Sequence, residues 1–266
     1  MSLTPQLVQP ETLDVGKDDA KRRIAYILHP ATDETKPTLV WLGGYRSDMS
    51  GTKAVEIERH ARETRCACLR LDYSGHGASG GAFREGTISR WLEESLAVID
   101  RTVRGRMILI GSSMGAWIAL RAVQTLRARG EGQRLAGLVL IAPAPDFTVD
   151  LIEPNLTEAE RASLAERGYF EEPTPYGPDA NIYTAALIED GRDNVVLSGM
   201  IETGCPIHIL QGMADPDVPF AHALKLMEHL PADDVVMTLI GDGDHRLSRP
   251  EDIERILAAI DGLMAA

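Results

Sequence analysis

Cysteine is scarce in this chain of 266 residues, which contains only Cys66, Cys68 and Cys205. An odd number of cysteines without metal-ligand spacing argues against a disulfide-stapled fold and against a cysteine-rich zinc site. Cys66 and Cys68 share one face of a strand-like segment, where free cysteine packs as a small hydrophobic side chain. We therefore expect buried free thiols, as in a reducing compartment, and no resident metal.

Positive charge is also in short supply, since 27 Lys and Arg face 40 Asp and Glu for a net charge of −13. Nucleic acids and anionic membranes bind clustered Lys and Arg, so neither is expected as a partner. Long apolar runs are missing too. No segment approaches the length that spans a bilayer, and residues 1–17 lack the apolar core of a signal peptide. These absences predict a cytoplasmic protein without a membrane span.

What the chain does contain is 44% apolar residues, enough for one large α/β core, and we expect a single domain over residues 1–266. From residue 23 onward, short apolar runs alternate with segments of helical periodicity. This alternation is typical of a mostly parallel sheet with helices on both faces. The expected strands are 23–28, 38–42, 67–71, 107–110, 138–141, 207–211 and 235–240. The expected helices are 52–64, 88–103, 114–129, 219–230 and 250–264.

The segment 111–115 reads Gly-Ser-Ser-Met-Gly and fits the pattern G-x-S-x-G. It directly follows the apolar run 107–110 and opens a helix-like stretch, which is the strand–turn–helix setting of a nucleophile elbow. Such a turn holds its middle serine at the edge of a sheet in a strained conformation, and flanking glycines leave the necessary room. Ser113 is therefore the candidate nucleophile, whereas Ser112 is interpreted as part of the turn.

A serine hydroxyl needs a positioned base, and the base needs an acid that orients it. In the fold where this turn occurs, the chain order is Ser, then Asp or Glu, then His. His245 fits the base best because it lies in a loop directly after the strand 235–240, where open α/β sheets build their sites. The competing His76 precedes the serine and lies between turn glycines.

The acid is expected after the preceding strand, 207–211, where Asp215 and Asp217 both occur. Asp215 is nearer the strand end and is our choice, while Asp217 could cap the following helix with its side-chain oxygen. Asp242 and Asp244 are close to the histidine in sequence and are interpreted as solvated turn carboxylates.

Acyl transfer also needs N–H donors for the developing oxyanion, and losing one typically costs about 2.7–4 kcal/mol. One donor is expected to be the backbone N–H of Met114, directly after the nucleophile. The second is expected after the strand 38–42, where Gly43 and Gly44 allow the backbone to approach the substrate and Tyr45 offers its N–H. An ordinary turn is the alternative interpretation of the two glycines.

Residues 144–204 interrupt the alternation of strands and helices, because they are proline-rich and show only short helical patterns at 157–166 and 183–189. An excursion of this length is usually a lid over the site, with a surface decoration as the alternative. We favour a cap because the excursion leaves the strand beside the serine strand. Four aromatic residues are candidates for the pocket beneath it, of which the first fits the core equally well: Trp117, Phe147, Tyr169 and Phe170.

Several loop motifs together resemble those of the α/β-hydrolase superfamily, namely 44–49 with 53–55, 71–79, 111–115, 212–215 with 218–219, and 244–246. The chain is most similar to the branch of small acyl-protein thioesterases that includes palmitoyl-protein thioesterase and acyl-glucuronide esterase, from about residue 37 to the C-terminus. The resemblance implies an α/β-hydrolase fold with a cap. It implies Ser113, Asp215 and His245 as the triad. It also implies Tyr45 and Met114 as oxyanion donors.

The expected function is that of a serine hydrolase that forms an acyl-Ser113 intermediate and releases it with water activated by His245. Its substrate is expected to be a small-molecule ester or thioester, and no cofactor is expected. The same groups suit a peptidase or a C–C bond hydrolase, and a non-catalytic binding protein on a hydrolase scaffold is the alternative from another class. The sequence indicates neither the oligomeric state nor the length of the acyl chain.

Overall fold

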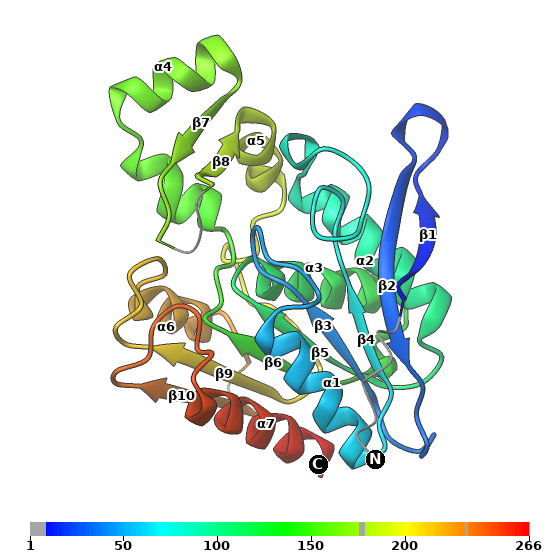
Figure 1. Cartoon of the computed structure of the whole chain (residues 1–266). Coiled ribbons are helices and arrows are strands. Elements are labelled where there is room, and N and C mark those ends of the chain that lie inside the picture. Colours follow the sequence, from blue (N-terminus) through cyan, green and yellow to red (C-terminus); the bar gives the residue numbers. More distant parts are fainter. Residues whose placement is uncertain (1–8, 176–178, 232–233, 266) are drawn as a thin grey trace, which may run out of the picture.

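The computed structural model describes residues 9–175, 179–231 and 234–265. Most of these residues form one sheet of eight strands or pack around it (Figure 1). The strands are β1 (Glu11–Val15), β2 (Arg22–His29), β3 (Thr38–Leu42), β4 (Cys68–Leu71), β5 (Met107–Ser112), β6 (Leu135–Ile141), β9 (Ile207–Gly212) and β10 (Val235–Ile240). Their order across the sheet is β1-β2-β4-β3-β5-β6-β9-β10. Of these strands only β2 runs against its neighbours, so the expectation of a mostly parallel sheet is confirmed.

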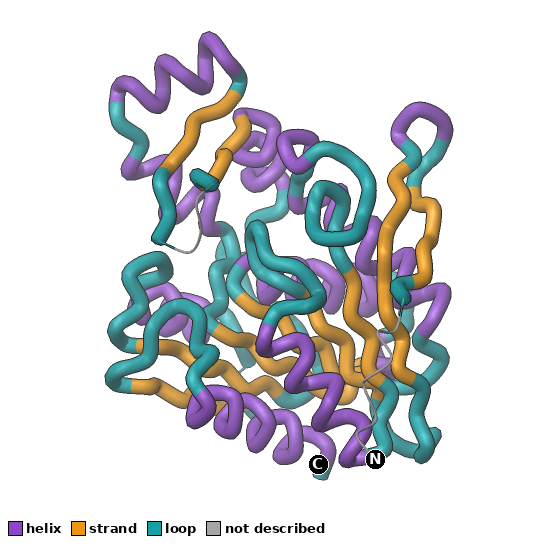
Figure 2. Tube along the Cα trace, in the orientation of Figure 1, coloured by secondary structure: helices purple, strands orange, loops and turns teal. Residues whose placement is uncertain are grey.

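Helices cover both faces of the sheet, as expected (Figure 2). The longer ones outside the excursion after β6 are α1 (Thr52–Thr64), α2 (Ile88–Thr102), α3 (Met114–Ala128), α6 (Phe220–Glu228) and α7 (Pro250–Met264), and single turns occur at η1 (Asp18–Ala20), η2 (Phe83–Glu85) and η3 (Gly132–Arg134). The buried side chains of α1 and α7 form one hydrophobic core with the sheet, and those of α2, α3 and α6 form the other. Each helix therefore buries an apolar stripe against one face.

The strand β5 lies near the middle of the sheet, between β3 and β6. All six of its residues are buried, because strands flank it on both sides and helices cover both faces. Its parallel neighbours end at the same edge of the sheet, which brings together the loops that follow β3, β5, β9 and β10. The sequence signals for the nucleophile, the acid, the base and the oxyanion loop all fall in those loops.

Residues 148–175 and 179–193, which we call the cap segment, leave the sheet after β6 and lie beyond the carboxyl ends of its strands (Figure 1). The segment consists of η4 (Thr148–Ile152), η5 (Glu153–Asn155), α4 (Glu158–Arg167), β7 (Tyr169–Glu172), β8 (Asn181–Thr184) and α5 (Ala185–Asp193). The helix predicted at 157–166 is confirmed as α4. The second helix was predicted to begin at residue 183, and this start was wrong, because α5 begins at Ala185. Thr184 caps it by accepting a hydrogen bond from the N–H of Leu187.

Two strands in the cap segment and one at the sheet edge were not expected from the sequence. β7 and β8 form an antiparallel hairpin, and β1 pairs with β2. Within β1 only Val15 is buried, so the strand carries little of the apolar alternation by which strands are recognised.

Among the described residues, no helix has both the length and the apolar character needed to cross a membrane.

Candidate active site

Ser113 lies at the sharp turn between β5 and α3, with backbone angles φ 54° and ψ −119°. A non-glycine residue rarely adopts this conformation, and such strain persists only where the surroundings impose it. A side chain at Gly111 would collide with the backbone of Gly115 and Ala116, and one at Gly115 would collide with the Leu42 carbonyl. The two glycines therefore let the turn pack against the sheet while it presents the Ser113 side chain.

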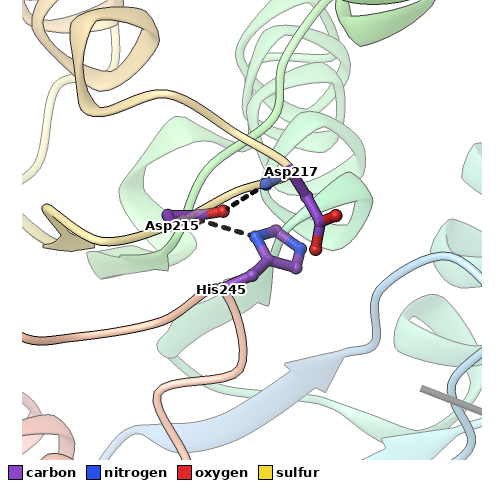
Figure 3. Close-up of side chains that lie close together, drawn as sticks. All are labelled: Asp215, Asp217 and His245. Atoms are coloured by element: carbon purple, nitrogen blue, oxygen red, sulfur yellow. Dashed lines mark hydrogen bonds and ion pairs between the residues drawn. The ribbon is translucent and has the colours of Figure 1, made fainter. Parts of the chain in front are cut away.

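Ser113, His245 and Asp215 form a continuous chain of hydrogen bonds, although they come from three separate loops. The distance from His245 Nε2 to Ser113 Oγ is 3.0 Å. The distance from His245 Nδ1 to Asp215 Oδ2 is 2.8 Å, and Figure 3 shows this pair. Because an ionised carboxylate only accepts hydrogen bonds, the proton between His245 and Asp215 belongs on Nδ1. Nε2 is then free of a proton and accepts from the serine hydroxyl, which is the arrangement a general base requires.

Asp215 is held in place by more than the histidine. Its Oδ1 accepts backbone N–H bonds from Asp217 at 2.9 Å and Val218 at 2.8 Å, and Gln211 Nε2 donates to Oδ2 at 3.2 Å. Burial alone would raise the pKa of this carboxyl. The hydrogen bonds and charge of His245, with the two backbone donors, outweigh burial and hold the pKa of Asp215 below its usual value. Asp215 is therefore an ionised, fixed partner for the imidazole.

Asp217 lies beside this pair, and one ligand atom from each of Asp215, Asp217 and His245 falls within 4.8 Å of the others (Figure 3). Such a group resembles a set of metal ligands. However, His245 Nδ1 and both oxygens of Asp215 already take part in hydrogen bonds within the protein. These bonds account for the closeness of the three side chains without an ion.

The two backbone N–H groups expected to form an oxyanion hole lie around Ser113. Met114 is the first residue of α3, and Gly44 packs so closely that a Cβ there would lie 3.3 Å from Ser113 Cβ. Both Met114 and Tyr45 line the same cavity as Ser113. In the described part of the chain neither N–H has a backbone or side-chain acceptor. Two N–H groups are thus available beside the serine, one of them at the positive end of a helix.

His76, the competing base, serves a different purpose. Its Nδ1 lies 3.2 Å from the Ser74 carbonyl oxygen, and its Nε2 accepts from the Arg46 N–H at 3.2 Å. Burial, the largest influence, lowers the pKa of His76 to about 4, with the nearby Arg46 charge acting in the same direction. The ring is therefore neutral at pH 7. It fixes Arg46, which has a φ of 57° and directly follows Tyr45.

Replacing His76 with Gln is expected to flatten the dependence of folding stability on pH. The pKa of His76 is about 4 in the folded chain, against 6.5 for an ordinary histidine. As pH falls, the unfolded chain therefore binds a proton at this ring at a higher pH than the folded chain does. Wild type therefore loses stability as pH falls from 6.5 towards 4. The full difference corresponds to about 3 kcal/mol. Urea unfolding at several pH values checks this. An identical slope for His76→Gln and wild type would contradict the buried neutral ring.

A cavity of about 670 Å³ opens above Ser113 and His245. The cap segment contributes much of the cavity wall. Its apolar and aromatic contributions are Leu151, Ile152, Leu156, Phe170 and Tyr183, and its polar ones are Asn155, Glu160, Glu172, Thr174, Asp179 and Asn181. Of the predicted pocket residues, Gly44, Phe147 and Phe170 line the cavity. The structure therefore brings the predicted nucleophile, acid, base and donor loop together around one space, with the cap segment over it.

Trp117 and Tyr169 lie elsewhere among the described residues, contrary to the expectation for pocket aromatics. Trp117 is fully buried in the core, and its indole N–H donates to the Asn194 carbonyl at 3.0 Å. Tyr169 lies between the guanidinium groups of Arg84 and Arg167, at 3.8 and 4.3 Å from the ring centroid. Cation–π contacts of this kind hold the ring at the surface of the hairpin rather than in the cavity.

Tyr183 was not anticipated as part of the cavity wall. It stacks on the ring of Tyr45, with centroids 5.4 Å apart and planes 11° from parallel. The Tyr45 hydroxyl in turn donates to the carbonyl oxygen of Ile182. No local pattern in the sequence points to this pair, because the two tyrosines are 138 positions apart and Tyr183 was counted in a helix.

Known proteins resemble this chain over most of its length. The family model described as Alpha/beta hydrolase family matches residues 39–258. The mitochondrial palmitoyl-protein thioesterase ABHD10 of Homo sapiens is 31% identical over 230 residues, which cover 86% of this chain and 73% of that protein. A hydrolase-like protein from Agrobacterium vitis S4, known from a crystal structure, is 59% identical with a TM-score of 0.94, covering 97% of this chain and 100% of that one.

The mouse alpha/beta hydrolase domain-containing protein 10 has a similar structure, with a TM-score of 0.82 and 28% identity over 96% of this chain and 98% of its own. The TM-scores of 0.94 and 0.82 show that both relatives share the fold of this chain over most of its length. Since the family match begins within β3 and includes every later strand of the sheet, the chain belongs to the alpha/beta hydrolase family.

Proposed function

We propose that the protein is a serine hydrolase that cleaves carboxylic esters or thioesters through an acyl-Ser113 intermediate. The observation that carries this proposal is the hydrogen-bonded chain from Asp215 through His245 to Ser113, with distances of 2.8 and 3.0 Å, at the floor of a cavity. The name of the human relative, a palmitoyl-protein thioesterase, supports a thioester of a long acyl chain as one substrate class.

In the proposed reaction, His245 Nε2 takes the proton of Ser113 Oγ as the oxygen attacks the substrate carbonyl. The N–H groups of Met114 and Tyr45 donate to the resulting oxyanion. The imidazolium, stabilised by Asp215, then protonates the departing alcohol or thiol. Water enters, gives a proton to His245 and attacks the acyl-enzyme. His245 then returns that proton to Ser113 Oγ as the bond between Oγ and the acyl group breaks, which releases the acid and restores Ser113. Positioning of the base contributes roughly 10²–10⁴-fold to the rate.

The acyl chain is assigned to the apolar residues that line the cavity under the cap segment. Phe147 and Phe170 are both mostly buried and contribute rings to this wall, and Met114 forms part of its floor. A chain placed there loses contact with water along its length, which favours longer acyl groups.

The cytoplasmic location expected from the sequence remains a prediction, and the human relative is named as mitochondrial.

Hydrolysis of p-nitrophenyl esters and acyl thioesters of increasing chain length tests this proposal. We expect kcat/KM to rise with chain length, by at most about fourfold per methylene, because each buried methylene contributes about 0.8 kcal/mol. Negligible rates with every ester and thioester would contradict an acyl hydrolase.

Two neighbouring residues of β7 provide a matched pair for the same series. Phe170 is buried and lines the cavity, whereas Tyr169 lies outside it against two arginines. Phe170→Ala is therefore expected to flatten the dependence on chain length, and Tyr169→Ala to leave it as in wild type. If both variants flatten it equally, the acyl chain does not lie where we assign it.

A further inference from the structure

The hairpin of β7 and β8 contacts the loop of residues 43–47, which we call the donor loop because it carries Tyr45. Among the described strands β8 pairs only with β7, so alternate carbonyl groups along its other edge have no strand to bind. Two carbonyls on this edge, those of Ala180 and Ile182, accept hydrogen bonds from the side chains of Arg46 and Tyr45. Two consecutive residues of the donor loop therefore bind the open edge of the hairpin.

The donor loop has little backbone structure of its own. Among the described residues, one hydrogen bond joins two of its backbone groups, from the Ser47 N–H to the Gly44 carbonyl at 3.1 Å. Gly43 and Gly44 precede Tyr45, and glycine leaves the backbone free to adopt many conformations. Arg46 follows with a φ of 57°, which a non-glycine residue rarely adopts unless its surroundings impose it. The direction of the Tyr45 N–H therefore depends on what the side chains of this loop bind.

The side chain of Tyr45 is fixed at its ring and at its hydroxyl. The ring stacks on Tyr183 of β8 and meets Phe83 and Phe147 edge-on, with centroids 5.0 and 6.1 Å away. The hydroxyl donates to the Ile182 carbonyl. A side chain held at both places leaves its own Cα little room to move, so the N–H of the same residue keeps one direction.

Arg46 fixes the peptide group on the other side of Tyr45. Its N–H donates to His76 Nε2 at 3.2 Å, while its guanidinium group donates to the Ala180 carbonyl and lies 3.7 Å from Asp179 Oδ2. The backbone of Arg46 is thus tied to the body of the protein and its side chain to the hairpin. Both ends support the unusual φ of this residue.

The strand that receives these bonds is itself anchored. α5 follows β8 directly, and Asp190 of α5 accepts the N–H of Ser89 of α2 at 2.9 Å. Asn194, at the end of α5, donates to Ser89 Oγ at 2.8 Å. Because α2 packs against the sheet, the carbonyl groups of β8 are held in a fixed place relative to Ser113.

We propose that the hairpin positions the N–H of Tyr45 for the oxyanion, with the Tyr45 hydroxyl and the Arg46 guanidinium as the positioning groups. This inference rests on the proposed function, in which that N–H stabilises the transition state. The two groups act through the backbone of the donor loop. The cap segment is then more than a wall of the cavity, because the rate of the chemical step depends on its contact with this loop.

Replacing Tyr45 with Phe tests the proposal, since it removes one hydroxyl and keeps the ring and the N–H. We expect kcat for p-nitrophenyl butyrate to fall about 10- to 100-fold, because complete loss of an oxyanion donor costs about 10²–10³-fold and a small misplacement costs part of that. KM should stay within about twofold, because the donor acts mainly on charge that develops in the transition state. Steady-state kinetics measure both constants.

Two competitive inhibitors separate positioning from a general loss of structure. With 1,1,1-trifluoro-2-octanone, Ser113 Oγ adds to the carbonyl carbon, the hydroxyl proton passes to His245, and the former carbonyl oxygen becomes an anion. 2-Octanol fills the same cavity without forming an oxyanion. In Tyr45→Phe we expect the Ki of the trifluoroketone to rise about 10- to 100-fold, as kcat falls, and the Ki of the alcohol to stay within about twofold.

Further variants assign the effect to the contact with the hairpin. Arg46→Met is expected to lower kcat about tenfold or more, and Arg46→Lys to restore most of this loss, because an ammonium group can still donate to the Ala180 carbonyl. Tyr169→Phe is the matched control. It removes a hydroxyl from the same hairpin, one that binds Arg167 rather than the donor loop, and should keep kcat and both Ki values. Urea unfolding checks that each variant is folded.

A wild-type kcat in Tyr45→Phe or Arg46→Met would overturn the proposal. Equal weakening of the trifluoroketone and the alcohol would also overturn it, as would an equal loss of kcat in Tyr169→Phe. Failure of the proposed function has a different result. In that case wild type would not hydrolyse the ester faster than Ser113→Ala does, and it would bind the trifluoroketone no more tightly than the alcohol.

Discussion

Replacing Ser113 with Ala is expected to lower kcat for ester hydrolysis by about 10⁴- to 10⁶-fold. The reason is that His245 Nε2, 3.0 Å from Ser113 Oγ, would no longer have a hydroxyl to activate, while the N–H donors and the cavity remain. Some residual hydrolysis by water is therefore expected. Steady-state kinetics with a p-nitrophenyl ester measure the loss, and a fluorophosphonate probe reports covalent reaction at the serine.

The preceding residue offers a matched control for this experiment. Ser112 is the last residue of β5 and is buried within the sheet, and no hydrogen bond joins it to His245 among the described residues. Ser112→Ala should keep the fluorophosphonate label and stay within about tenfold of the wild-type rate. Labelling of Ser113→Ala to the wild-type extent would refute Ser113 as the nucleophile.

Replacing Asp215 with Asn is expected to lower kcat by about 10⁴-fold. The amide keeps the shape of the carboxylate, but it removes the negative charge that stabilises the imidazolium. Its NH₂ group can also face His245 Nδ1, which would favour the tautomer with the proton on Nε2 and so leave no acceptor for the serine hydroxyl. Kinetics with the same ester as for Ser113 measure the effect, while urea unfolding shows whether the fold is retained.

Asp217 serves as the control for Asp215, since it is two positions away and lies beside the same imidazole. It holds Asp215 through its backbone N–H, which an Asn substitution leaves in place. Asp217→Asn is therefore expected to change kcat by less than about tenfold. The opposite ranking, with a large loss for Asp217→Asn and a small one for Asp215→Asn, would move the orienting role to Asp217.

The sequence predicted the central sheet well, because its strands are short apolar runs bounded by turns. The ranges 38–42 and 235–240 agree with β3 and β10, and 52–64 and 250–264 agree with α1 and α7. Edge and cap strands carry weaker signals. In β1 only one side chain is buried, and in β7 both glutamates are exposed, so neither strand shows a clear apolar period.

The candidate site could be predicted as far as its chemistry follows local motifs. Each of Ser113, Asp215 and His245 stands shortly after a strand, and parallel strands bring such loops together. The walls of the cavity could not be predicted in the same way, because side-chain direction depends on packing between distant segments. Trp117 lies in the core because its ring is turned towards Asn194, 77 positions away, and the pairing of Tyr45 with Tyr183 is equally non-local.

The link between Tyr45 and the hairpin limits how this enzyme can be rebuilt. The backbone of Tyr45 belongs to the loop beside Ser113, while its hydroxyl donates to the Ile182 carbonyl and its ring stacks on Tyr183. A cap grafted from another hydrolase would have to bring its own acceptor and its own ring to these two positions. Without them, the half-buried Tyr45 hydroxyl would lose its partner, and chimaeras should keep the tyrosine and the hairpin as one exchangeable unit.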